Sequence, residues 1–153
     1  MEKKAFFRLT LSAIALGAAV FAAATPARAA DAQLIWSANS AQINQSTEAL
    51  KEGRYAHVIR FAKEALRSKT SPANHLIARH NLCIAYIADG KRDAAKPFCD
   101  LALNAEARYQ IIDRDGLVVS TTEIASDATA PTLEAAVRAN IARAQGSALA
   151  ENR

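Results

Sequence analysis

The stretch NLCIAYIADGKRDAAKPFCDLAL, residues 81–103, decides the fold of this chain because it encodes a complete helical hairpin. Apolar residues recur three and four positions apart on both sides of Asp89-Gly90-Lys91, which is the pattern of two amphipathic helices joined by a short turn. An earlier stretch repeats the pattern at a shift of 37 residues. The matching positions are Asn44 with Asn81, Gly53 with Gly90, and Ala65-Leu66 with Ala102-Leu103.

Each predicted hairpin has two helices around a glycine. In the first hairpin, residues 32–66, the apolar stripe of the first helix contains Ile35, Trp36, Ile43 and Leu50, and Gly53 separates the two helices. In the second hairpin, the helices cover residues 74–88 and 92–105. An apolar stripe of this kind must be covered by another element, so we expect the hairpins to stack.

The helical pattern fades after residue 107. Asp113-Arg114-Asp115-Gly116 is a turn signal, and residues 117–122 are apolar or β-branched without helical spacing. We therefore expect an irregular connector over residues 108–130 that contains a short extended piece. Pro131 suits the start of a final helix over residues 131–149, whose apolar face would cap the stack.

Residues 1–29 have the composition of a secretory signal peptide. Basic residues precede an apolar run at residues 9–24, and Ala27-Arg28-Ala29 matches an Ala-x-Ala cleavage site. The run is shorter than the roughly 20 residues that cross a bilayer, which favours cleavage over membrane anchoring. We predict cleavage near Ala29, a periplasmic or secreted mature chain, and no membrane-spanning segment after the leader.

The charge of the whole chain is dominated by this leader. The sequence has 19 Lys and Arg against 15 Asp and Glu, and four of the basic residues but only one acidic residue lie in residues 1–29. The mature chain is therefore close to neutral, with its basic residues scattered among acidic ones. Such a pattern offers no broad surface for phosphate binding, so nucleic acid is not an expected partner.

The two hairpins resemble the tetratricopeptide repeat family, whose unit of about 34 residues pairs two antiparallel helices around a glycine turn. The positions that carry the resemblance are Asn81-Leu82, Ala85-Tyr86, Gly90, Ala95 and Ala102-Leu103 in the second unit, and Gly53, Tyr55 and Ala65-Leu66 in the first. The resemblance implies an all-α fold of stacked antiparallel hairpins, a short right-handed solenoid over residues 30–107 with the C-terminal helix as its cap. Asn140-Ile141 echoes Asn81-Leu82 and suggests a degenerate third unit. A generic helical bundle is the alternative.

In this family the first helix of each hairpin lines a groove that binds an extended peptide or a helix of a partner. By register, the candidate groove residues are Ile43, Asn44, Thr47, Ile77, His80, Asn81 and Ile84. Asparagine can bond a peptide backbone with both donor and acceptor, and isoleucine offers apolar contact. Bonding of Asn44 and Asn81 within the repeat is an equal alternative, and Ile77 and Ile84 could instead be covered by an N-terminal or C-terminal segment.

Both cysteines of the sequence lie in the second hairpin. Cys83 is seven residues before Gly90 and Cys99 is nine residues after it, so they should lie at similar heights on facing helices. Facing helices at ordinary packing distance bring Cα atoms to roughly 3.4–5.4 Å, which overlaps the disulfide range. Because an exported chain meets an oxidising compartment, we predict a structural disulfide. The alternative is a thiol-disulfide redox pair, although Cys-x-x-Cys is absent.

No motif in the sequence predicts catalysis, a metal site or a cofactor. His57, His75 and His80 lack the spacing of a metal site, and no nucleophile elbow, phosphate-binding loop or dinucleotide fingerprint is present. The leading hypothesis is an exported, non-catalytic protein-interaction module that binds a peptide or partner protein. The alternatives are a redox protein using Cys83 and Cys99, or a structural envelope protein that self-associates, for example as a homodimer.

Overall fold

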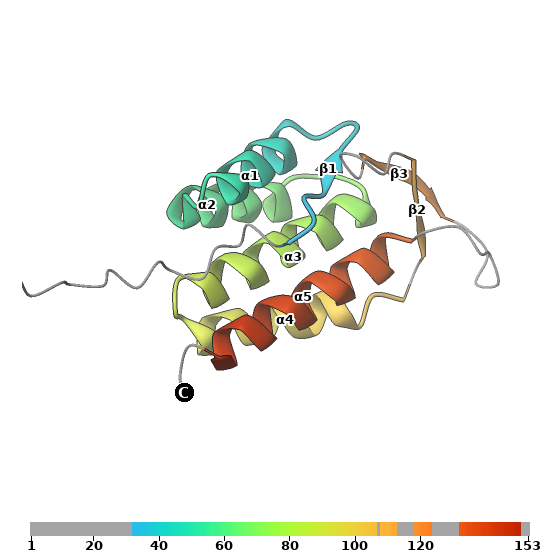
Figure 1. The fold of residues 1–153 in the computed structure, drawn as a ribbon. Coiled ribbons are helices and arrows are strands. Elements are labelled where there is room, and N and C mark those ends of the chain that lie inside the picture. The colour runs from blue at the N-terminus through green and yellow to red at the C-terminus, as the bar shows by residue number, and fades with distance from the viewer. Residues whose placement is uncertain (1–31, 107, 113–117, 124–131, 151–153) are drawn as a thin grey trace, which may run out of the picture.

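A computed structural model describes residues 32–106, 108–112, 118–123 and 132–150 (Figure 1). The predicted signal peptide lies outside the described residues, as does much of the predicted connector. The described chain contains five helices and three short strands. The helices are α1 (Ala41–Lys51), α2 (Tyr55–Arg67), α3 (Pro72–Ala88), α4 (Arg92–Leu103) and α5 (Leu133–Ala150), and the strands are β1 (Trp36–Ser37), β2 (Tyr109–Ile111) and β3 (Val118–Glu123).

The sequence signals at the helix ends explain where the hairpin helices begin and turn. The Ser40 hydroxyl caps α1 by accepting the Ile43 N–H, and the Ser71 hydroxyl caps α3 by accepting the Asn74 N–H. Gly53 and Gly90 turn the chain after α1 and α3 with φ of 70° and 72°. Left-handed backbone of this kind is strained for any residue with a side chain, so glycine is favoured at both turns.

The helices pack in sequence order. Contacts join α1 to α2, α2 to α3 and α3 to α4, while α5 packs against both α3 and α4. Figure 1 shows α1, α3 and α5 following one another across one side of the molecule. The expectation of packed antiparallel hairpins followed by a C-terminal helix is thus confirmed at the level of a mainly helical fold.

The fold is not purely helical, which corrects the all-α prediction. The three strands form a sheet of order β1-β3-β2, in which β1 pairs parallel to β3 and β2 pairs antiparallel to it. The strands β2 and β3 occupy part of the stretch predicted as an irregular connector. Extended backbone needs partners for its N–H and C=O groups, and pairing these distant segments supplies them.

The start of the first helix was also predicted wrongly. Ile35 and Trp36 precede α1 and lie in or beside β1 instead of forming a helical stripe. The Ser40 cap sets the beginning of α1 at Ala41, six residues after Ile35, and Ile35 is nevertheless fully buried. An apolar residue can thus contribute to a helical core from an extended segment.

The buried core lies between the helices and under this N-terminal segment. Its largest fully buried apolar side chains are Ile35, Ile43, Leu50, Val58, Ile77, Leu82, Ile84, Leu133, Val137 and Ile141. In the part of the chain that the structure describes, no helix is both long and apolar enough to cross a membrane.

Candidate functional site

The predicted groove residues are not open to solvent. Ile43, Thr47, Ile77, His80, Asn81 and Ile84 are buried, and only Asn44 is partly exposed. In this structure these side chains therefore face other parts of the same chain. The structure agrees with the alternative that other segments of the same chain cover them. Such a cover is expected, because exposing the apolar stripes of α1 and α3 to water costs free energy.

The N-terminal cover is an extended stretch, residues 33–37, which we call the resident segment. Figure 1 shows the blue N-terminal trace of this region crossing in front of the helices. The Thr47 hydroxyl donates to the Ile35 carbonyl at 2.7 Å. At one end of the segment, the Asn44 amide accepts the Ser37 N–H at 2.8 Å and donates to the Ser37 carbonyl at 2.9 Å.

The other end of the resident segment is held by a residue of α5. The Asn140 amide accepts the Gln33 N–H at 2.8 Å and donates to the Gln33 carbonyl at 2.8 Å. Asn44 and Asn140 therefore make the same two-point backbone contact with two residues of the resident segment, Ser37 and Gln33, which lie four positions apart. This bonding pattern needs no particular side chain on the strand that is held.

Side-chain contacts of the resident segment are few. Ile35 is fully buried, and the Ser37 hydroxyl donates to Asn74 Oδ1 at 2.6 Å. The Gln33 side chain is exposed, and Leu34 and Trp36 are only partly buried. Successive side chains of an extended chain point to opposite sides, so the buried Ile35 and Ser37 share the side that faces the helices.

A chain of buried polar groups continues from the resident segment into the helices. Asn81 Nδ2 lies 3.1 Å from Ser46 Oγ and 3.2 Å from Thr47 Oγ1, and Asn81 Oδ1 lies 2.9 Å from His80 Nδ1. On the other side of the ring, His80 Nε2 lies 3.0 Å from Asn140 Nδ2. The network thus joins α1, α3, α5 and the resident segment.

His80 is held neutral at the centre of this network. Burial removes the ring from water and lowers the pKa of His80 to about 4, while the hydrogen bond to Asn81 acts in the opposite direction. No described buried side-chain nitrogen or oxygen lacks a hydrogen-bond partner. A fully satisfied buried network of this kind fixes one arrangement of the elements that it joins.

Sequence reasoning named Asn44, Thr47, His80 and Asn81 but missed the residues that complete the site. Asn140 and Asn74 were not among the candidates, and neither was the strand that they hold. A signal for Asn140 was present, because its position in Asn140-Ile141 echoes Asn81-Leu82. No sequence pattern indicated that residues 33–37 would bond to α5.

The cysteines form the predicted disulfide. Cys83 on α3 and Cys99 on α4 are joined with a Cα–Cα distance of 4.9 Å, within the expected interval. Their side chains are 0% and 4% exposed. A redox pair acting on another protein needs an accessible sulfur, and this burial fits a structural staple better.

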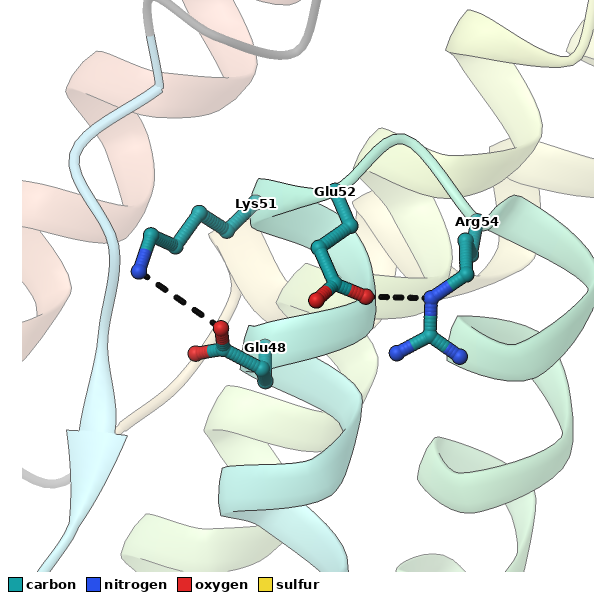
Figure 2. A network of polar contacts seen from close by, with 4 residues as sticks. All are labelled: Glu48, Lys51, Glu52 and Arg54. Carbon is teal, nitrogen blue, oxygen red and sulfur yellow. Dashed lines mark hydrogen bonds and ion pairs between the residues drawn. The ribbon is translucent and has the colours of Figure 1, made fainter.

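Charged residues of the first hairpin form a separate surface cluster at its glycine turn. Figure 2 shows Lys51 paired with Glu48 at 3.5 Å and Arg54 paired with Glu52. All four side chains are 42–57% exposed, so each pair contributes at most about 1 kcal/mol to stability. The cluster has neither the burial nor the convergence of a catalytic site.

Comparisons of the chain with protein-family models, with characterised proteins and with solved structures gave no match. The resemblance to tetratricopeptide repeats accordingly stays a prediction. Within the described residues, no group of three or more His, Cys, Asp or Glu side chains could hold a metal ion. The candidate site is therefore defined by the inner face of α1, α3 and α5 and by the strand that this face holds.

Proposed function

We propose that the protein is an exported, non-catalytic interaction module of tetratricopeptide-repeat type that binds an extended segment of a partner protein. The binding surface is the inner face of α1, α3 and α5, which we call the groove. The observation that carries this proposal is the resident segment, since the groove already holds an extended polypeptide through side-chain amides at both ends.

The contacts of the resident segment indicate which features a partner segment needs. Asn44, Thr47 and Asn140 bond backbone atoms, which every polypeptide supplies. Ile35 is the apolar side chain that the segment buries completely, so selectivity would come from a branched aliphatic residue at that position. The partner segment replaces the resident segment, because both use the same donors and acceptors.

The disulfide supports the exported setting of this proposal. Disulfides persist in oxidising compartments such as the bacterial periplasm and are rare in the cytosol. A staple between α3 and α4 would keep the second hairpin rigid while residues 33–37 leave and return. The groove would then keep its shape during exchange.

Competition between two strands offers a direct test. The probe is a fluorescent synthetic peptide with the sequence of residues 31–38, DAQLIWSA, added to the oxidised mature chain. The Ile35→Ala variant weakens only the resident segment, since removing a buried isoleucine side chain typically costs about 2–5 kcal/mol. Because a larger fraction of this variant has an open groove, we expect the probe to bind it at least about tenfold more tightly than wild type.

Matched controls distinguish binding in the groove from nonspecific binding of the probe. Gln33→Ala changes an exposed side chain on the same segment and leaves the backbone contacts in place, so probe affinity should equal that of wild type. A probe with Asp in place of Ile35 should not bind. The proposal is wrong if Ile35→Ala remains folded by circular dichroism and binds neither the probe nor its Val-containing analogue.

A further inference from the structure

The hydrogen-bond directions around His80 can be assigned from the backbone outward. The Gln33 N–H can only donate and the Gln33 carbonyl can only accept, which fixes Asn140 with Oδ1 toward the former and Nδ2 toward the latter. Asn140 Nδ2 has a second hydrogen, and this hydrogen faces His80 Nε2. His80 Nε2 must therefore be an unprotonated acceptor.

The other side of the ring gives the same tautomer independently. The Thr47 hydroxyl donates its proton to the Ile35 carbonyl, and the Ser46 hydroxyl donates its proton to the Val58 carbonyl at 3.5 Å. Both hydroxyl oxygens can then only accept from Asn81 Nδ2, which leaves Asn81 Oδ1 to accept from the ring. His80 carries its one proton on Nδ1, 2.9 Å from that oxygen.

A second proton on His80 has no place in this arrangement. It would set an N–H on Nε2 against the N–H of Asn140 at 3.0 Å, with the amide unable to turn without losing both bonds to Gln33. We propose that His80 and Asn140 form a proton-operated latch on the groove. Protonation of Nε2 expels Asn140, and the resident segment and α5 then move away from α1 and α3.

No charged neighbour changes this expectation. Outside β3, no Asp, Glu, Lys or Arg among the residues that the structure describes is buried, and every charged side chain of α2 and α4 is exposed. On α3, the helix of His80, Arg79 is partly exposed, and the charged groups on the other two network helices, α1 and α5, are paired at the surface or exposed. Glu48 and Lys51 pair with each other, Glu134 accepts the Tyr109 N–H, and Arg138 and Arg143 are exposed. The low pKa of His80 accordingly follows from burial.

The latch controls the site named under the proposed function and rests on that proposal for its purpose, but its opening is measurable without any partner. Nitrogen chemical shifts of the oxidised chain report the tautomer of each histidine. We expect His80 to be the Nδ1–H tautomer at pH 7 and to stay neutral in the folded chain far below the ordinary histidine pKa of 6.5. Protonation of His80 in the folded chain near pH 6.5 would overturn the proposal.

Hydrogen exchange measures which elements open. Between pH 7 and pH 5, after correction for the chemical exchange rate, the opening of residues 32–40 and 133–150 should increase on the order of 20-fold, while residues 81–103 stay protected. The His80→Gln variant keeps an acceptor for Asn140 without a titrating group, so its opening should not rise in this way. An equal rise in His80→Gln, or simultaneous opening of residues 81–103, would contradict the latch.

In the Asn140→Asp variant, we expect the effect of pH on the opening of the cover to be reversed. A carboxylate at this position accepts a hydrogen bond from protonated His80 Nε2, so acid should close the cover instead of opening it, and opening should increase from pH 5 to pH 7. This reversal cannot arise from loss of structure alone. If acid opens the wild-type cover and the DAQLIWSA probe still fails to bind at pH 5, the latch stands and the proposed function fails.

Discussion

The second hairpin and the cover of its inner face are held together by different interactions. The α3–α4 hairpin has a covalent link between Cys83 and Cys99 and stacked rings of Tyr86 and Phe98, whose centroids are 5.8 Å apart. The cover, consisting of the resident segment and α5, combines apolar packing with amide contacts that depend on one neutral histidine. One region should therefore tolerate changes of solution conditions, and the other should respond to them.

The largest expected effect concerns the hairpin. The double variant Cys83→Ala with Cys99→Ala loses a link across 16 residues, which by the loop-entropy model lowers the free energy of unfolding by about 3 kcal/mol. Urea unfolding followed by circular dichroism measures this loss. Wild type with reductant is the control, and it should match the variant to within the small packing difference. Unchanged stability in both would refute the view of the hairpin as the rigid region.

The pH dependence of stability tests the cover. The folded state holds His80 neutral with a pKa of about 4, whereas the unfolded chain takes up a proton near the ordinary histidine pKa of 6.5. Folding stability is therefore complete above pH 6.5 and falls as the pH drops toward 4, by roughly 2 to 3 kcal/mol. Urea unfolding at pH 7, 5.5 and 4 measures the fall. The His80→Gln variant is the control, because its free energy of unfolding changes with pH through the carboxylates but not through residue 80. If the free energy of unfolding falls with pH equally in this variant, His80 does not cause the fall.

The Asn44→Ala variant weakens the cover at its other end. Its amide makes two bonds to Ser37, and their loss should cost about 1 to 2 kcal/mol. Hydrogen exchange should show faster opening of residues 32–40 than of residues 81–103. Gln45→Ala, an exposed change on the same helix, is the matched control and should leave both rates unchanged. Equal acceleration of the two regions would show that the cover and the hairpin open as one unit.

The smallest expected effects come from substituting one glycine in each region. Gly90→Ala places a side chain in left-handed backbone at φ of 72°, which should cost about 1 kcal/mol although no atom lies within 4 Å of the added carbon. Gly146→Ala lies inside α5, also with open space around it, and should stabilise by about 0.5 to 1 kcal/mol. Thermal melts of both variants give opposite shifts if backbone conformation decides the outcome, and shifts of the same sign would contradict it.

Prediction from sequence succeeded where an element depends on its own residues. The helices of both hairpins follow from apolar spacing, the turns from Gly53 and Gly90, and the disulfide from cysteines at similar distances from the second turn. It failed at Ile35 and Trp36, whose apolar character fits a helix as well as a buried strand. Only the position of the Ser40 cap decides between the two.

The candidate site was anticipated in part, because Asn44, Thr47, His80 and Asn81 were chosen by their register in the predicted repeat. Their environment was not anticipated. A register places residues on one face of a helix, but it does not say whether solvent, a partner or the same chain covers that face.

The sequence by itself determined the hairpins, their turns and the staple, because each depends on residues at most a few helical turns apart. Only the tertiary structure decided that the inner face is occupied and that His80 is neutral. The contact responsible joins Gln33 to Asn140 across 107 residues, and His80 meets Asn140 across 60. No local pattern encodes such a pairing, because it exists only when α1, α3 and α5 have packed and removed the polar groups between them from water.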